Sequence, residues 1–287
     1  MTTAARVGVV GHVEWVQFAV VDHYPVQGEI VVASEWFEEA SGGGSVASVQ
    51  LRKLGGEAAF FCALGDDDTG ARARRELTGR HGLELHAATR AGPHRRGFTH
   101  LDPDHERTIT VMGERLVPHG DDPLPWERID DLDAVYLTGG DAAAVREARR
   151  ARFLVATTRA FGVLAESGVE LDVLLASATD EGERVDAERL RPAPRHIVLT
   201  HGSKGGTWTA VDGRTGSWAA VDPPDDPVDA YGCGDSFAAG VAFGLGAGYG
   251  LDGALEIGAR CGAWCLAGRG PYGRQLTAAE LPPRRPA

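Results

Sequence analysis

The chain has 287 residues, 43% of them hydrophobic, and a formal net charge of −12. This length and apolar content suit one α/β domain with an appendage, and the acidic balance argues against non-specific nucleic-acid binding, which needs a basic surface. The four cysteines form no C-x-x-C pair, and no stretch approaches a membrane span. We therefore expect free thiols, no membrane partner and a cytoplasmic protein.

The first third of the chain predicts strands around a glycine-rich loop and a helix. Apolar runs bounded by glycine and proline predict strands, and a period of three to four residues predicts a helix. The predicted strands are Val7–Val10, Trp15–Val21, Glu29–Trp36 and Glu57–Ala63, and the predicted helices are Ser45–Leu54 and Ala71–His81.

The rest of the chain alternates short apolar runs with helical patterns. The further predicted strands are His94–Leu101, Arg107–Met112, Ala134–Leu137, Phe153–Ala156, Val173–Leu175 and Ile197–Thr200. The predicted helices are Asp141–Arg150, Ser236–Gly246 and Leu255–Leu266, and a loose tail follows from Leu281 to Ala287.

Strand–helix alternation is typical of a mostly parallel sheet covered by helices on both faces. We therefore predict one α/β domain over residues 1–287. Residues of about 12–36 and 94–112 do not fit this alternation. We expect them to form a small separate sheet over one edge of the body.

The segment Asp229-Ala-Tyr-Gly-Cys-Gly-Asp235 carries the strongest chemical signal. A helix is predicted to begin near Asp235, and the N–H groups of a helix N-terminus attract anions. Gly232 and Gly234 would let the backbone, with Cys233 between them, approach a phosphate closely. Asp235 would then be either the N-cap of this helix or a base that faces the anion.

This segment resembles the C-terminal signature D-T-x-G-A-G-D of the PfkB carbohydrate-kinase family, with Ala230 and Cys233 as departures. The resemblance implies a ribokinase-like fold, whose mostly parallel sheet between helices carries a small β-sheet lid. It also implies phosphotransfer from ATP, with Mg²⁺, to a hydroxyl of a small sugar or sugar-like substrate. Asp235 would be the general base, and the amides of Gly232–Gly234 would hold the developing charge.

The segment from Ser41 to Gly55 resembles the N-terminal signature of the same family, in which a glycine pair precedes a helix ending in Leu-Gly. The resemblance implies substrate contacts at Gly42, Gly43 and Gly44. It also places Val46, or Ala47 after a one-residue slip, where relatives carry a sugar-binding asparagine. The same residues satisfy G-x-G-x-x-A, but a dinucleotide fingerprint needs a strand directly before it, so the nicotinamide interpretation is rejected.

Two later segments add nucleotide and metal candidates. Val198 to Trp208 resembles the T-x-G-x-x-G turn that borders the nucleotide in the family, with Thr200, Gly202 and Gly205 matching. Asp180 ends a Ser-x-x-Asp sequence where relatives have N-x-x-E, so it would act on Mg²⁺ through water. Asp229 would help place a monovalent cation.

The acceptor is the least constrained part of the prediction. Relatives carry a sugar-binding aspartate near position 16, where this chain has Val16, with Glu14 and Gln17 close by. A sugar is the first candidate, and a nucleoside, suited by the apolar residues, is the second. A third is a non-catalytic ligand-binding protein of the same fold. A homodimer formed through the lid is also expected from the resemblance.

Overall fold

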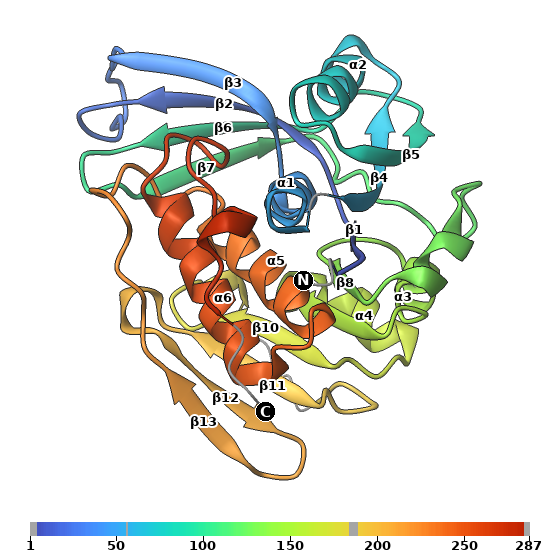
Figure 1. The fold of residues 1–287 in the computed structure, drawn as a ribbon. Coiled ribbons are helices and arrows are strands. Elements are labelled where there is room, and N and C mark those ends of the chain that lie inside the picture. Colours follow the sequence, from blue (N-terminus) through green and yellow to red (C-terminus); the bar gives the residue numbers. More distant parts are fainter. Residues whose placement is uncertain (1–4, 56, 184–188, 284–287) are drawn as a thin grey trace.

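The computed structural model describes residues 5–55, 57–183 and 189–283, and a large sheet runs through its centre (Figure 1). The strand order is β13-β12-β11-β10-β9-β8-β1-β4-β5. All neighbours from β11 to β5 are parallel, and β12 and β13 extend this sheet in antiparallel fashion. The bounds are β1 (Val7–Val10), β4 (Ala58–Gly65), β5 (Glu84–Arg90), β8 (Ala134–Leu137), β9 (Phe153–Thr157), β10 (Val173–Ser177), β11 (His196–Thr200), β12 (Gly206–Ala210) and β13 (Thr215–Trp218).

Helices cover both faces of this sheet (Figure 1). One face carries α1 (Gly43–Gly55), α5 (Cys233–Gly246) and α6 (Gly250–Leu266), and the other carries α3 (Ala142–Ala148) and α4 (Phe161–Ser167). The strand β4 shows why both faces are needed: Phe60 belongs to the core under α1 and α5, whereas Phe61 belongs to the core on the other side. Successive side chains along a strand point to opposite faces of the sheet, so a strand that is apolar throughout must be covered by helices on both faces.

A second sheet of four strands, in the order β3-β2-β6-β7, lies beside the large one (Figure 1). Its strands are β2 (Glu14–Val20), β3 (Glu35–Ser41), β6 (Arg96–Leu101) and β7 (Arg107–Met112). One face of this sheet packs towards α5, because Phe18 on β2 meets Tyr231 edge-on at 4.8 Å between ring centroids. The predicted small separate sheet is therefore present.

Several predicted boundaries were wrong. The third strand covers Glu35–Ser41 rather than Glu29–Trp36, because Glu29–Ala33 lies in an exposed connection. The helix predicted over Ala71–His81 is α2 (Asp68–Arg75), capped by Asp67 and continued by a π-helical turn over Glu76–Arg80. The strand β5 had not been predicted. Of the predicted tail, residues 284–287 lie outside the described residues.

Parallel strands place their carboxyl ends on one edge of the sheet, and loops from that edge build the sites of such folds. His12, Thr138, Arg159, Glu183 and Thr200 follow or end β1, β8, β9, β10 and β11, respectively. None of the helices in the described ranges is long and apolar enough to cross a membrane.

Candidate active site

The helix α5 begins at the glycine pair, and Asp235 does not cap it. Gly232 is the N-cap residue, with a left-handed φ of 84°, and no side chain caps the first turn. Asp235 lies inside this first turn. The N–H groups there retain the partial positive charge of a helix N-terminus, which favours an anion. The capping role considered for Asp235 is thus excluded, and its carboxylate is available for chemistry.

Asp235 is half-buried at the centre of the carboxyl edge. The hydroxyl of Tyr136 donates a hydrogen bond of 3.4 Å to its Oδ1. Burial raises the pKa of Asp235 to about 6, although Arg159, Arg107 and the Tyr136 hydrogen bond oppose this rise. A carboxylate with such a pKa is ionised at neutral pH and still basic enough to accept a proton.

Arg159 and two carboxylates form a charged group on one side of Asp235. The guanidinium of Arg159 pairs with Asp180 and donates a hydrogen bond of 2.8 Å from Nε to Glu183 Oε1. Glu183 also accepts the backbone N–H of Ser177 at 2.8 Å. The negative charge of Glu183 raises the pKa of Asp235, so the two carboxylates interact electrostatically. Oxygen ligands of this kind suit Mg²⁺, which retains water when it binds.

His12, Glu14 and Arg95 occupy the other side of Asp235, between β1 and the small sheet. Glu14 Oε1 lies 2.9 Å from Arg95 Nε and 3.7 Å from His12 Nε2. Burial raises the pKa of Glu14, and the charge of Arg95 opposes this rise. Glu14 therefore orients Arg95.

Glycines 42 to 44 bring α1 against this group. The left-handed φ of Gly42 is 86°, and a Cβ on Gly44 would lie 2.7 Å from the carbonyl oxygen of His12. A Cβ on Gly43 would lie 2.6 Å from Asp235 Oδ1. Only Gly43 of the three thus lies directly against the base, and the other two permit the close packing of the chain around it.

Two of the predicted substrate residues, Val46 and Gln17, have other neighbours in the structure. Val46 is fully buried in α1 and packs towards Gly232, where a Cβ would lie 3.0 Å from its Cγ1. Gln17 is exposed and hydrogen-bonds Glu38, on the face of β2 opposite to Phe18. A one-residue step along a strand reverses the face. The geometry therefore does not favour acceptor contacts by either residue.

The turn that contains Thr200, Gly202 and Gly205 connects β11 to β12 at the same carboxyl edge. Gly205 has a left-handed φ of 81°, and a Cβ there would lie 2.1 Å from the carbonyl oxygen of Trp218. The hairpin itself therefore requires Gly205. Gly202, with a φ of 59°, has no atom within 4 Å of a Cβ and borders open space.

Asp229 joins two loops beneath the start of α5. It is buried, its Oδ1 accepts the N–H of Tyr231 at 2.9 Å, and its Oδ2 accepts the N–H of Gly270 at 2.6 Å. The turn between β6 and β7 also reaches this loop, because the carbonyl oxygen of His105 accepts the N–H of Ala230 at 3.0 Å. The small sheet is thus in direct contact with the segment that leads to the base.

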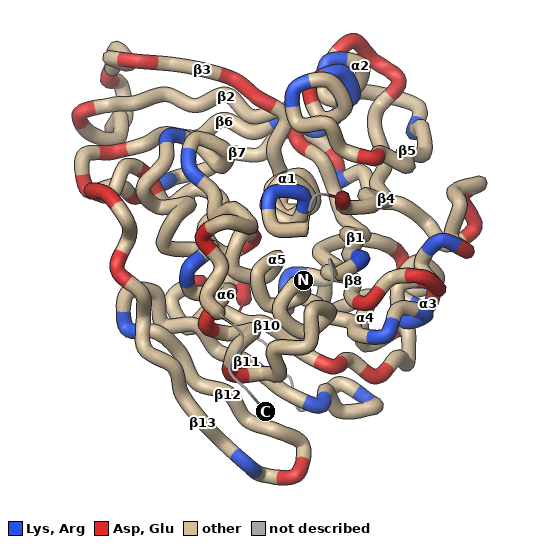
Figure 2. The backbone as a smooth tube through the Cα atoms, viewed as in Figure 1, with Lys and Arg blue, Asp and Glu red and all other residues tan. Residues whose placement is uncertain are grey.

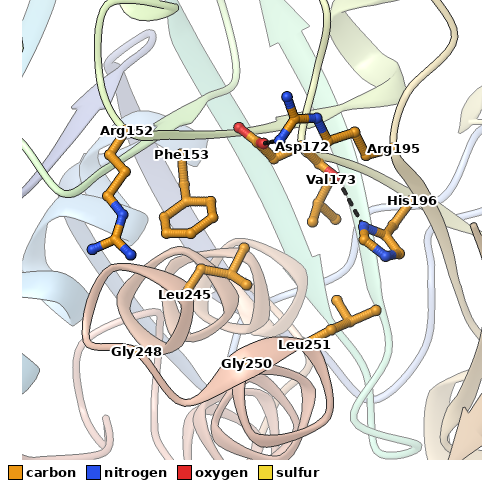
Figure 3. A pocket seen from close by; sticks show the side chains of 10 residues that line it. All are labelled: Arg152, Phe153, Asp172, Val173, Arg195, His196, Leu245, Gly248, Gly250 and Leu251. Carbon is orange, nitrogen blue, oxygen red and sulfur yellow. Dashed lines mark hydrogen bonds and ion pairs between the residues drawn. The ribbon is translucent and has the colours of Figure 1, made fainter.

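A cavity of about 390 Å³ lies away from these residues (Figure 3). It opens at the amino ends of β9 and β10, beside Phe153 and Val173, and is closed by Leu245 and Leu251. Asp235 lies at the opposite, carboxyl edge, so this cavity is separate from the candidate active site.

Three functional candidates had not been predicted: Arg95, Arg159 and Glu183. Each lies outside the glycine motifs, on a segment that follows or precedes a strand. The only sequence signal was their position near strand ends.

Comparison with known proteins is consistent with this geometry. Residues 169–277 match the model of the pfkB family carbohydrate kinases. A Halopiger xanaduensis protein described as an ATP-dependent ribose-1-phosphate kinase is 32% identical over 281 residues, covering 90% of each chain. This chain belongs to the PfkB family. The expected family membership is therefore confirmed, and with it ATP-dependent phosphotransfer to a hydroxyl of a sugar or sugar-like substrate.

Solved structures of PfkB relatives show the same fold. A ribokinase of Thermotoga maritima superimposes with a TM-score of 0.77 at 18% identity, covering 96% of this chain and 98% of its own. A nucleoside kinase of Methanocaldococcus jannaschii gives 0.72 at 14% identity, covering 97% of both chains. The predicted ribokinase-like architecture is confirmed.

Proposed function

We propose that Asp235 is the general base of this PfkB kinase. The observation that carries the proposal is a half-buried carboxylate with a pKa of about 6, within the uncapped first turn of α5. The acceptor hydroxyl would give its proton to Asp235 while its oxygen bonds to the γ-phosphorus. The bond to the bridging oxygen would break, and ADP would leave with that electron pair.

The backbone of Gly232, Cys233 and Gly234 would stabilise the charge on the transferred group, as preorganised N–H donors do. We propose that the nucleotide lies towards the turn of Thr200, Gly202 and Gly205. Thr200 ends β11, beyond β9 and β10 in the sheet order, on the same side of Asp235 as Arg159.

Two cations belong to this proposal. Glu183 and Asp180 would hold Mg²⁺ through water, since the two carboxylates carry more negative charge than the one guanidinium of Arg159 between them offsets. The ion would offset charge on the β- and γ-phosphates. The lone pairs of Asp229 that accept no backbone N–H leave room for a monovalent cation between the Tyr231 and Gly270 loops.

The acceptor would lie under the small sheet, which would act as its lid. Val16, Thr99 and Val111 share the face of this sheet that carries Phe18. Because the Halopiger relative is described as acting on ribose-1-phosphate, we propose a phosphorylated pentose as acceptor. A nucleoside is the second candidate, favoured by the exposed apolar side chain of Val111.

A substrate panel tests the proposal. Wild-type protein and Asp235→Asn are compared with Mg·ATP on ribose, ribose-1-phosphate, ribose-5-phosphate and two nucleosides, with ADP release as the readout. We expect turnover of a pentose phosphate and a loss of at least about 10²-fold in Asp235→Asn. Near-full activity of the Asp235→Asn protein would contradict the assignment of Asp235 as the base. Preferred turnover of a nucleoside would contradict the assignment of a pentose phosphate as the acceptor.

We also propose a cytoplasmic homodimer. The four free cysteines suit a reducing compartment. Exposed apolar side chains lie on both edge strands of the small sheet, with Ile109 on β7 and Trp36 on β3, and Ile30 lies in the connection before β3. Pairing of two small sheets would cover such an edge. Light scattering after size-exclusion chromatography measures the mass, and a monomer of 30.3 kDa would contradict the dimer.

A further inference from the structure

Arg115 is a half-buried cation without a partner. It lies after β7, and among residues 5–55, 57–183 and 189–283 no group forms a hydrogen bond or ion pair with its guanidinium. Burial lowers its pKa, and the like charge of Arg95 lowers it further. A partly desolvated cation is costly unless something offsets it.

The segment around Arg115 lies across the Glu14–Arg95 pair. A Cβ on Gly113 would lie 3.8 Å from Arg95 Cα, and one on Gly139 would lie 3.2 Å from Val117 Cγ1. Arg115 lies midway between residues 113 and 117. Arg95 Nε lies 2.9 Å from Glu14 Oε1 in an ion pair, yet this buried nitrogen has no partner with hydrogen-bond geometry among the described residues. The charge of Glu14 therefore acts on both guanidinium groups, and the charge of Asp235 also acts on Arg115.

His12 adds a donor to this group. Its Nε2 accepts the N–H of Gly43 at 3.4 Å, so the proton of the neutral ring is on Nδ1. His12 is 6% exposed, and Nδ1 has no hydrogen-bond partner among the described residues. Burial and the charges of Arg115 and Arg95 hold the pKa of His12 well below its ordinary value. The ring is neutral and presents one unused N–H.

This excess of donors is local, because the chain as a whole is acidic. Figure 2 shows acidic and basic residues interspersed over the fold, and the net charge is −12. Arg159, the cation on the nucleotide side, is already engaged by Asp180 and Glu183. Glu14 forms an ion pair with Arg95, and no residue in the described ranges forms one with Arg115, so an anion fits here.

The position of these donors indicates which phosphate they could bind, the γ-phosphate of ATP or a phosphate carried by the acceptor. His12 follows β1 and Arg95 precedes β6, whereas Arg159, Glu183 and Thr200 follow or end β9, β10 and β11. Asp235 contacts Tyr136 on β8, the strand between β1 and β9. The donors therefore lie on the side of the base away from the proposed nucleotide.

We propose that Arg95, Arg115 and the Nδ1–H of His12 bind a phosphate group that the acceptor already carries. This inference rests on the proposed function and assigns its specificity. The donors would hold the phosphate at one end of the acceptor and leave a hydroxyl at the other end beside Asp235.

Steady-state kinetics of Arg115→Gln and Arg95→Gln test the proposal. We expect the KM for the phosphorylated pentose to rise about 10- to 100-fold, since each variant removes hydrogen bonds between charged groups. The KM for ATP should change far less than the KM for the phosphorylated pentose, and the ratio of kcat/KM for phosphorylated ribose to that for free ribose should fall by about the same 10- to 100-fold. Arg152→Gln, the same substitution at an exposed arginine beside the distant cavity, is the matched control.

An equal rise in KM for free and phosphorylated ribose would overturn the proposal, as would a rise confined to ATP. Calorimetry without ATP tests the phosphate-binding subsite independently of the proposed phosphotransfer. The Asp235→Asn protein should bind ribose-1-phosphate more tightly than ribose, and Arg115→Gln in that background should abolish the difference. If wild-type protein turns over no pentose but this difference is found, the subsite stands and the proposed reaction fails.

Discussion

Gly43 and Asp235 are so close that a methyl group on Gly43 would lie 2.6 Å from Asp235 Oδ1. The same methyl group would lie 3.1 Å from the hydroxyl of Thr138. The N-terminus of α1, the end of β8 and the first turn of α5 therefore meet at one point. The absence of a side chain at Gly43 leaves the room that the base occupies.

Replacing Gly43 with alanine should displace the Asp235 carboxylate. We expect kcat to fall about 10²-fold, because a displacement of about 1 Å at a reacting group has effects of this size. The control is Gly162→Ala in α4, where no atom lies within 4 Å of the added Cβ. That variant should keep full activity and gain up to about 1 kcal/mol of stability. Equal activity of the two variants would contradict the proposed contact.

Gly232 and Gly234 should respond differently to alanine. Gly232 has a φ of 84°, and its Cβ would meet Pro271 and Val46 at 3.0 Å, so Gly232→Ala should lower the free energy of unfolding by at least about 1 kcal/mol. No atom lies within 4 Å of a Cβ on Gly234. Gly234→Ala should therefore fold normally and lose about 10²-fold in kcat/KM for ATP, because the methyl group would occupy the place of the phosphate. Thermal unfolding and kinetics of both proteins separate the two effects.

The activity should depend on the protonation of Asp235. Its base form is present above a pKa of about 6, so kcat/KM should fall about tenfold per pH unit below that value. Tyr136→Phe removes a hydrogen bond that favours the ionised carboxylate, so the midpoint should move to higher pH. Because a sugar phosphate also titrates near pH 6, the movement of the midpoint is the decisive measurement. An unmoved midpoint would argue against Asp235 as the titrating group.

Glu39 should make the protein less stable as the pH rises. Burial on β3 raises its pKa from 4.5 to about 7, although Arg80 lies 3.2 Å from Oε2. A carboxyl group with a raised pKa contributes stability below its unfolded pKa and loses it as the pH rises through the folded value. At pH 8, Glu39→Gln should exceed wild type by about 2–3 kcal/mol in urea unfolding, and the difference should vanish below pH 4.5. The exposed Glu127→Gln should show no such pH-dependent difference.

Most strands and helices and the glycine turn before Asp235 were predictable because local patterns specify them, whereas β5, β12 and β13 were not predicted. Gly232 caps a helix of small and apolar residues that is buried from Ser236 to Gly246, and β4 is buried throughout. The start of β3 was misplaced because the apolar residues Ile30 and Val32 suggested a strand, although 93% of the Ile30 surface is exposed. Their alternation satisfies a strand pattern without any neighbouring strand to pair with.

By itself, the sequence determined the family and the α/β fold and proposed Asp235 as the base, because these depend on residue types at short, regular spacings. Only the tertiary structure decided that Val46 faces Gly232, that Gln17 lies on the outer face of β2 and that Arg115 lies beside Arg95 and His12. A one-residue change of register reverses the face of a strand, and segments far apart in the chain meet only where parallel strands end together. The acceptor side of the site is built from such long-range contacts, so it could not be predicted from the sequence alone.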